Sequence, residues 1–291
     1  NHLTGFGSGL VDLPSTLHVV NLADNDFEMT GAEAFERLSQ VGSDGGATSW
    51  SSIRELTISG NDITGELPAL DRFQHLTKLL VRDTRLEGEL PTWSGLSWGD
   101  LSQLQVLDLS QNDFEGELPG QLSGMTQLEE LVLSNNGFTG QLPDVKGLPN
   151  LRVLKADYND LEGSIPDPCP DGASTPPCAS NLEEINLCCN DFEGELPAGL
   201  EHLTFVQKLH VQQNRLEGMA PATLSNKQDL AELDISYNFI SASVTDLIDA
   251  IDNRGYMYEM DLSHNQLTGE LEANLAEFTR AGNLWFNHNA I

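Results

Sequence analysis

Positively charged residues are scarce in this chain. The 291 residues include 14 Lys and Arg against 45 Asp and Glu, which gives a formal net charge of −31 at pH 7. A surface with this charge repels phosphate backbones and anionic lipid headgroups, so nucleic acid and anionic membranes are poor partners. Cationic partners, divalent ions or a saline medium suit it better.

Long apolar runs and catalytic motifs are also absent from the sequence. No run of 18 apolar residues occurs, so we expect no membrane span in this segment. The first five residues lack the basic start and apolar core of a signal peptide. His-Glu-x-x-His and phosphate-binding glycine loops are missing, so we expect a protein that is not an enzyme.

What the sequence contains is a repeat of about 24 residues centred on asparagine. The clearest copy reads L-x-x-L-x-L-x-x-N from Leu104 to Asn112 and continues to Gly116 and Pro119. Thr84 takes the asparagine position once, and we expect that coil to be the least regular. The asparagines in this frame are Asn25, Asn61, Asn112, Asn136, Asn159, Asn190, Asn214, Asn238, Asn265 and Asn289.

This spacing predicts an α/β solenoid of about 11 coils. The leucines of each coil point inward along a short strand, and no coil can bury its apolar edge without neighbours. The asparagine side chain turns inward and bonds backbone groups that would otherwise be buried without partners. Stacked coils then place their strands side by side in a parallel sheet, which we expect on the concave face.

A second motif, Gly-x-Leu/Ile-Pro, follows the asparagine in six coils. It begins at Gly65, Gly88, Gly116, Gly140, Gly163 and Gly194. With this motif the chain resembles the plant-specific leucine-rich repeats of receptor-kinase ectodomains and polygalacturonase-inhibiting proteins. The resemblance implies short lateral strands, a right-handed superhelix and ligand binding on the concave face. The acidity and the absence of Asn-x-Ser/Thr sequons fit an algal or protist member of that family.

The chain begins and ends inside a repeat, whereas members of this family usually carry cysteine-bearing caps. We therefore expect one solenoid over residues 1–291, a fragment without its caps, whose open ends could self-assemble. Insertions interrupt the repeat at residues 28–52, 92–102, 167–180 and 245–255. Residues 30–41 and 246–253 are predicted to be helices, and Trp93 with Trp98 a packed loop.

Four cysteines are present, two of them in an insertion rich in Pro and Gly. We predict a disulfide between Cys169 and Cys178, with zinc as the alternative, although no Cys-x-x-Cys pair or nearby histidine supports zinc. Cys188 and Cys189 are free or linked to each other. A disulfide implies an oxidising compartment, so we expect an extracellular, cell-surface or secretory-lumen location.

Acidic residues recur at fixed positions around the Gly-x-Leu-Pro motif, and stacking should align them along one edge. A solvated edge suited to saline water is the simple interpretation. The alternative is a weak Ca²⁺ site, since carboxylates facing one another can share a divalent cation. Its candidate ligands are Asp113, Glu115, Glu117, Asp191, Glu193 and Glu195. No other cofactor is expected.

Basic and aromatic residues fall together in the strand segments, where solvated strand residues are the simple interpretation and a ligand-binding strip the alternative. Candidate binding residues are Arg54, Lys78, Arg82, Arg152, Lys155, Tyr158, Lys208, His210, Tyr237 and Trp285. His264 and His288 share a repeat position and are expected to be surface histidines. We therefore expect a recognition module for a protein, peptide or glycan. The alternative is a structural or adhesive segment that assembles with the help of cations.

Overall fold

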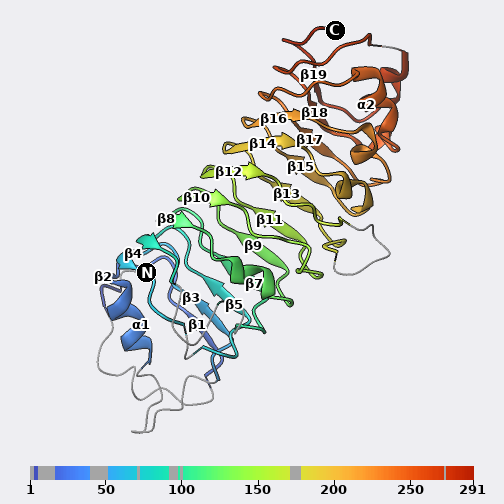
Figure 1. Cartoon of the computed structure of the whole chain (residues 1–291). Helices are drawn as coiled ribbons and strands as arrows, with labels where there is room; N and C mark the ends of the chain where they lie inside the picture. The colour runs from blue at the N-terminus through green and yellow to red at the C-terminus, as the bar shows by residue number, and fades with distance from the viewer. Residues whose placement is uncertain are drawn as a thin grey trace. The chain divides into compact units, whose positions relative to one another are not determined.

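The computed structural model describes residues 3–5, 17–39, 52–70, 73–91, 98, 101–170, 178–271 and 273–291. The chain forms two compact units, Asn1–Thr139 and Gly140–Ile291. Each unit is a leucine-rich repeat solenoid in which short parallel strands stack coil upon coil (Figure 1). The predicted fold class is therefore confirmed.

The first sheet takes one strand of three residues from each coil, and the middle residue points into the core because side chains alternate along a strand. In the first unit the neighbouring strands are β1 (Val19–Asn21), β3 (Glu55–Thr57), β5 (Lys78–Leu80), β7 (Val106–Asp108) and β9 (Glu130–Val132). In the second unit they are β11 (Val153–Lys155), β13 (Glu184–Asn186), β15 (Lys208–His210), β17 (Glu232–Asp234), β18 (Glu259–Asp261) and β19 (Asn283–Trp285).

A second parallel sheet consists of the lateral strands that follow each asparagine, as the resemblance implied. The first unit contains β2 (Glu28–Thr30), β4 (Asp62–Glu66), β6 (Arg85–Glu89) and β8 (Asp113–Glu117), with β10 (Gly137–Gln141) paired to β8 through its first three residues. The second unit contains β12 (Asp160–Ser164), β14 (Asp191–Glu195) and β16 (Arg215–Gly218).

The repeated asparagine joins each coil to the one before it. The Asn190 side-chain amide donates to the carbonyls of Leu187 and Cys188 in its own coil and to the carbonyl of Ala156 in the preceding coil. Its Oδ1 accepts the backbone N–H of Leu161 at 3.0 Å. One buried side chain thus satisfies four backbone groups that water cannot reach.

The coil with Thr84 in place of asparagine keeps both of its strands, β5 and β6. Thr84 donates its hydroxyl and its backbone N–H to Oδ1 of Asn112 in the following coil. Asn112 in turn donates to the carbonyl of Val81 at 2.6 Å. The neighbouring asparagine therefore supplies bonds that threonine lacks.

The glycine of the lateral strands is required by the backbone and, in one coil, also by close packing. Gly116 has φ +76° and Gly194 has φ +78°, values that side chains with a Cβ rarely adopt. A Cβ at Gly116 would lie 2.7 Å from Cγ of Glu89 in the preceding coil, whereas a Cβ at Gly194 would meet nothing within 4 Å.

The first insertion contains helix α1 (Gly31–Ser39), beside β2 and β4 (Figure 1). Thr30 and Glu33 form the predicted capping box, with bonds of 3.0 and 3.2 Å. The bond to the Thr30 backbone holds the pKa of Glu33 below its ordinary value. Trp98 is buried and donates to the carbonyl of Pro91, as a packed loop requires, while Trp93 lies outside the described residues.

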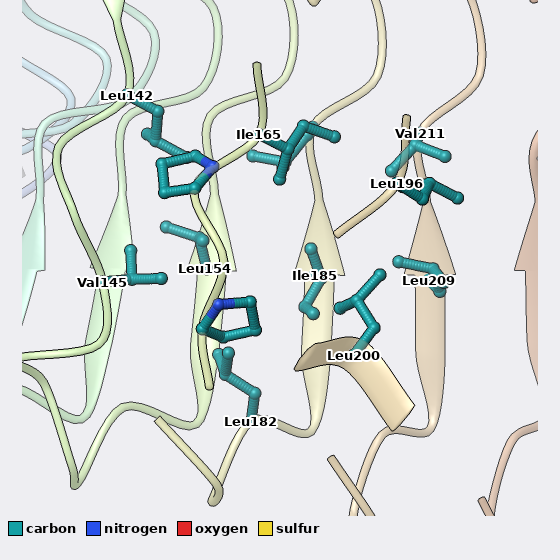
Figure 2. Close-up of a pocket in the computed structure, with 13 residues that line it drawn as sticks. Leu142, Val145, Leu154, Ile165, Leu182, Ile185, Leu196, Leu200, Leu209 and Val211 are labelled. Carbon is teal, nitrogen blue, oxygen red and sulfur yellow. The ribbon is translucent and has the colours of Figure 1, made fainter. Parts of the chain in front are cut away.

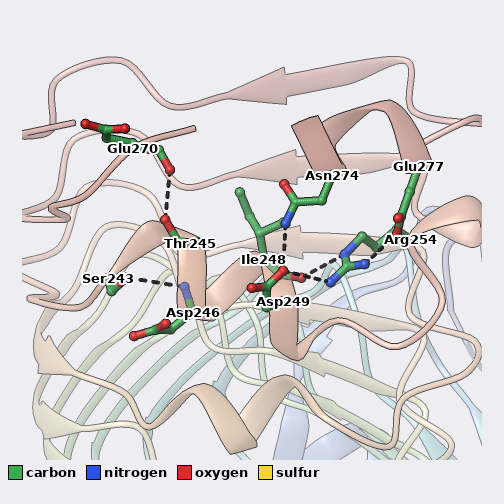
Figure 3. Close-up of polar contacts among 9 residues, drawn as sticks. All are labelled: Ser243, Thr245, Asp246, Ile248, Asp249, Arg254, Glu270, Asn274 and Glu277. Carbon is green, nitrogen blue, oxygen red and sulfur yellow. Dashed lines mark hydrogen bonds and ion pairs between the residues drawn. The ribbon is translucent and has the colours of Figure 1, made fainter. Parts of the chain in front are cut away.

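The last insertion forms helix α2 (Val244–Ala250). It begins two residues earlier than predicted because Ser243 caps it, and it ends three residues earlier, with Ile251 as its C-cap. The short 3-10 turn η7 (Arg254–Tyr256) follows. Arg254 bonds the Ile248 carbonyl and the carboxylates of Asp249 and Glu277 (Figure 3). Glu277 ends the 3-10 helix η8 (Ala273–Glu277) of the next coil, so this network ties α2 to its neighbour.

The cysteine-bearing insertion is closed by the predicted disulfide between Cys169 and Cys178. Asp167 anchors it, because its carboxylate accepts the backbone N–H of Cys169 at 2.9 Å and that of Gly199 at 3.2 Å. Gly199 lies in the 3-10 helix η5 (Ala198–His202) of a later coil. A small cavity, to which Pro168 of the insertion contributes, is lined by 13 apolar side chains, including Leu154, Ile185 and Leu209 (Figure 2).

Candidate functional site

The residue immediately before each repeated asparagine, or before Thr84 in the coil where threonine replaces it, has a left-handed backbone in every described coil. We call this the pre-asparagine position; its φ ranges from 51° to 66°. In the first unit it holds Asp24, Gly60, Asp83, Gln111 and Asn135. In the second unit it holds Tyr158, Cys189, Gln213, Tyr237, His264 and His288.

Three of these side chains in the second unit form an aromatic stack. The ring of Tyr237 lies 4.0 Å from that of His264, with 11° between the planes. The ring of His264 lies 4.1 Å from that of His288, with 26° between the planes. The Tyr237 side chain remains 52% exposed, and Trp285 on β19 is 37% exposed.

The predicted basic residues of the second unit are engaged with acids on neighbouring strands. Arg152 binds Glu183 through two bonds of 2.8 and 3.0 Å, which hold the pKa of Glu183 below its ordinary value. Lys155 lies 3.0 Å from Glu184. These ion pairs neutralise the positive charges of Arg152 and Lys155, which were predicted to make this face basic.

Lys208 and His210, both on β15, converge on one acid. Lys208 lies 3.0 Å and the His210 ring 3.4 Å from Glu232. The hydrogen bond to Glu232 raises the pKa of Lys208. The predicted basic residues of the second unit are therefore paired with acids of neighbouring strands.

The structure corrects the placement of several predicted binding residues. Lys78, Lys155, Lys208, His210 and Trp285 lie within strands of the first sheet. The others lie just before or just after these strands, which are only three residues long: Arg54, Arg82, Arg152, Tyr158 and Tyr237. Arg54, Lys78 and Arg82 belong to the first unit and the other seven to the second.

Two carboxylates that the sequence analysis did not single out lie beside the aromatic stack. Asp234 and Asp261 are partners in the register of β17 and β18, and Trp285 is the partner of Asp261 on β19. Burial raises the pKa of Asp234, and the charge of Asp261 adds to this. Over the described ranges, no lysine or arginine forms an ion pair with Asp234, Asp261 or Glu259.

The acidic edge lies on the exposed residues of the lateral strands. In the first unit Glu87 is the register partner of Asp113, and Glu89 that of Glu115. Glu117 faces Thr139 instead. In the second unit Asp191 is bound by Arg215 at 2.6 Å. Within the part of the chain that the structure describes, no three His, Cys, Asp or Glu side chains are grouped so that they could hold a metal ion.

The sequence indicated that His264 and His288 share a repeat position and that Tyr158 and Tyr237 are binding candidates, but the four residues were not joined into one row. Listing the residue before every repeated asparagine would have shown Tyr158, Tyr237, His264 and His288 in one row. The same comparison at the last strand residue would have placed Asp234 next to Asp261.

Among the helices that the structure describes, none has the length and the apolar composition that a bilayer span needs.

Comparisons with known proteins agree with the repeat. The family model described as Leucine Rich Repeat matches residues 103–125, 127–145 and 181–203, and a second leucine-rich repeat model matches residues 14–35. Receptor-like protein 32 of Arabidopsis thaliana is 31% identical over 255 residues. That alignment covers 76% of this chain but only 27% of the relative.

Solved structures show the same architecture. The ectodomain of the Arabidopsis thaliana receptor kinase GASSHO1/SCHENGEN3, solved with CASPARIAN STRIP INTEGRITY FACTOR 2, superposes with a TM-score of 0.77 and 28% identity, over 94% of this chain and 30% of the ectodomain. A plant ice-binding protein superposes with a TM-score of 0.66 and 20% identity, over 93% of this chain and 81% of that protein. The chain belongs to the plant-type leucine-rich repeat family.

Proposed function

We propose that this chain is a non-enzymatic recognition segment of an extracellular or cell-surface protein. It binds a peptide or protein segment on the exposed face of the first sheet in the second unit. The face comprises the aromatic stack, Tyr158, Trp285 and the carboxylates Asp234 and Asp261. The relatives support an extracellular or cell-surface location, since they include a receptor-like protein and a receptor ectodomain in a complex.

The observation that carries the proposal is the presence of tyrosine at the pre-asparagine position. Gly, Asn and Asp adopt a left-handed backbone at low cost, and all three occur there in the first unit. Tyr158 and Tyr237 have φ +54° and +51° and are 56% and 52% exposed. Neither backbone preference nor core packing accounts for these side chains. Exposed aromatic rings on a rigid sheet are typical anchors for a protein partner.

The charge of the same face indicates which partner it suits. Arg152, Lys155 and Lys208 are paired with acids of the protein itself. Asp234 and Asp261 have no such partner over the described ranges. Lysine or arginine side chains of a ligand could pair with these carboxylates and lay their stems against the rings. The ligand is therefore expected to be cationic.

A peptide selection tests this proposal. A random peptide library would be selected against the immobilised chain, and peptides rich in Lys and Arg should be enriched over acidic ones. Their affinity should fall by about tenfold or more when Asp234 and Asp261 are both changed to Asn. The control is Asp62→Asn with Asp113→Asn, which removes two carboxylates from the lateral edge of the first unit. Equal loss of affinity in the control would show that only the overall charge matters.

A second function, cation-dependent assembly, is supported by the facing carboxylates Glu87 with Asp113 and Glu89 with Glu115. Divalent cations can bridge such exposed pairs. Sedimentation of the chain with and without Ca²⁺ tests it. Association that reverses on addition of a chelator would favour assembly, and a constant sedimentation coefficient would eliminate it.

A further inference from the structure

Cys188 and Cys189, which are not part of the Cys169–Cys178 disulfide, are adjacent in sequence at the proposed recognition face, with Cys188 buried and Cys189 partly exposed. Cys188 and Cys189 follow β13, and Cys189 occupies the pre-asparagine position. Their sulfur atoms are 3.0 Å apart, within about 1 Å of the ~2.05 Å length of a disulfide bond.

The backbone of the coil holds the two thiols together. Consecutive side chains of a strand point to opposite faces, which normally separates neighbouring cysteines. Cys189 instead has φ +58°, and this left-handed turn directs its sulfur back toward Cys188. The turn is fixed on both sides, since the N–H of Cys189 bonds the Gln212 carbonyl at 3.0 Å and Asn190 bonds its own coil. The proximity of the sulfurs is therefore a property of the repeat.

We propose that Cys188 and Cys189 are a modification site that a small-molecule disulfide oxidises to a vicinal disulfide. The thiolate of Cys189 attacks one sulfur of the oxidant RSSR, which forms a mixed disulfide and releases one thiolate RS⁻. The thiolate of Cys188 then attacks the sulfur of Cys189 and releases the second RS⁻. The two cysteine sulfurs lose two electrons, RSSR gains them, and the two thiol protons leave with the two RSH products.

Exposure decides the order of the two steps. Cys188 is 3% exposed, so an external disulfide cannot reach it. Cys189 is partly exposed between Tyr158 and Gln213 of the neighbouring coils. Burial raises the pKa of the Cys188 thiol, so the closing step depends on the nearness of the Cys189 sulfur rather than on a high fraction of Cys188 thiolate.

The other two cysteines show that the chain suits oxidising conditions. Cys169 and Cys178 already form a disulfide, so neither is available to pair with Cys188 or Cys189. Oxidation would also alter the recognition face, because the Cys189 thiol contacts Gln213 Oε1 at 3.7 Å and the neighbouring Cys189 raises the pKa of Tyr158. A disulfide has no S–H to donate to Gln213.

The test is a redox titration of the full chain in buffers of reduced and oxidised glutathione. Samples are quenched with acid and alkylated, and the peptide carrying both cysteines is weighed. The expected result is a change from two alkyl groups to none, with a peptide about 2 Da lighter than the dithiol. A doubly alkylated peptide under conditions that keep Cys169 and Cys178 linked overturns the proposal. So does a stable glutathione adduct or a linked dimer.

Two matched variants separate the roles of the cysteines. Cys188→Ser removes the resolving thiol, so Cys189 should accumulate at least about tenfold more glutathione adduct than in the wild type. Cys189→Ser leaves the buried Cys188, which should take up no glutathione. The Cys169–Cys178 disulfide, found intact by the same mass measurement, reports that each variant has folded. Equal adduct formation in wild type and Cys188→Ser contradicts the proposal.

Discussion

The pre-asparagine position has the same backbone in both units but different side chains. In the first unit it holds Asp24, Gly60, Asp83, Gln111 and Asn135. All of these except Gln111 are residue types that commonly adopt a left-handed backbone. In the second unit it holds two tyrosines, two histidines, a cysteine and a glutamine. The repeat thus determines the backbone conformation at this position, whereas the residue type varies from coil to coil.

The comparison separates the cost in stability from the recognition role proposed for the second unit. A tyrosine in this conformation costs on the order of 1 kcal/mol relative to glycine or asparagine. In the second unit Tyr158 and Tyr237 carry this backbone cost, and their rings are exposed on the surface. The same fold in a plant ice-binding protein shows that the coils alone do not decide the function.

The largest effect should come from the asparagines and should be equal in the two units. Asn112→Ala in the first unit and Asn190→Ala in the second each leave several buried backbone groups without a partner. We expect each to lower the free energy of unfolding by about 3–5 kcal/mol in denaturant titrations. A loss below about 1 kcal/mol in either unit would break the claim that both share one backbone mechanism.

A buried lysine should make the stability of the second unit depend on pH. Lys227 is 1% exposed and donates to the carbonyls of Leu200 and Ser225, and burial lowers its pKa to about 8. Between pH 8 and the ordinary value of 10.5 the unfolded chain holds a proton that the folded chain has lost, so stability rises with pH. Relative to Lys227→Met, the wild type should gain about 3 kcal/mol across this window and show a constant difference below it.

Measuring both proteins by urea unfolding from pH 7 to 10.5 isolates this one group, since all other titrations are shared. If the free energy of unfolding of the wild type relative to Lys227→Met fell as pH rises, the lowered pKa of Lys227 would be contradicted. A difference that stays constant over the whole range would do the same.

A smaller effect should distinguish the lateral strands of the two units. Gly116→Ala and Gly194→Ala impose the same backbone penalty of about 1 kcal/mol. Only the first also forces its Cβ against Glu89, so it should cost about 1 kcal/mol more. The double variant Gly116→Ala with Glu89→Ala should remove that excess. Equal melting temperatures for the two single variants would show that Glu89 moves aside freely.

The smallest change in stability should come from the aromatic stack itself. Tyr237→Asn relieves the backbone strain but removes the contact with His264, which is worth a similar amount. Thermal unfolding should therefore change by less than about 1 kcal/mol in free energy. A loss of several kcal/mol would mean that the stack is a structural element, and the contrast between the units would lose its functional meaning.

Much of the fold could be predicted because it depends on residues that repeat. The spacing of Leu and Asn indicated the first sheet, the Gly-x-Leu-Pro motif indicated the lateral strands, and Thr30 with Glu33 located helix α1. The start of α2 was misplaced by two residues, since a helix end depends on the capping bond, here from the N–H of Asp246 to Ser243. The partners of Arg152, Lys155 and Lys208 could not be predicted, since they depend on which residues meet across neighbouring strands.

The most direct test compares one position in the two units, using a peptide selected against the wild-type chain. Its affinity would be measured by calorimetry for Tyr237→Asn in the second unit and for Asp83→Asn at the equivalent position of the first. The account predicts about a tenfold or greater loss for Tyr237→Asn and no change for Asp83→Asn. Equal affinities for the two variants, or a loss confined to Asp83→Asn, would contradict the placement of recognition on the second unit.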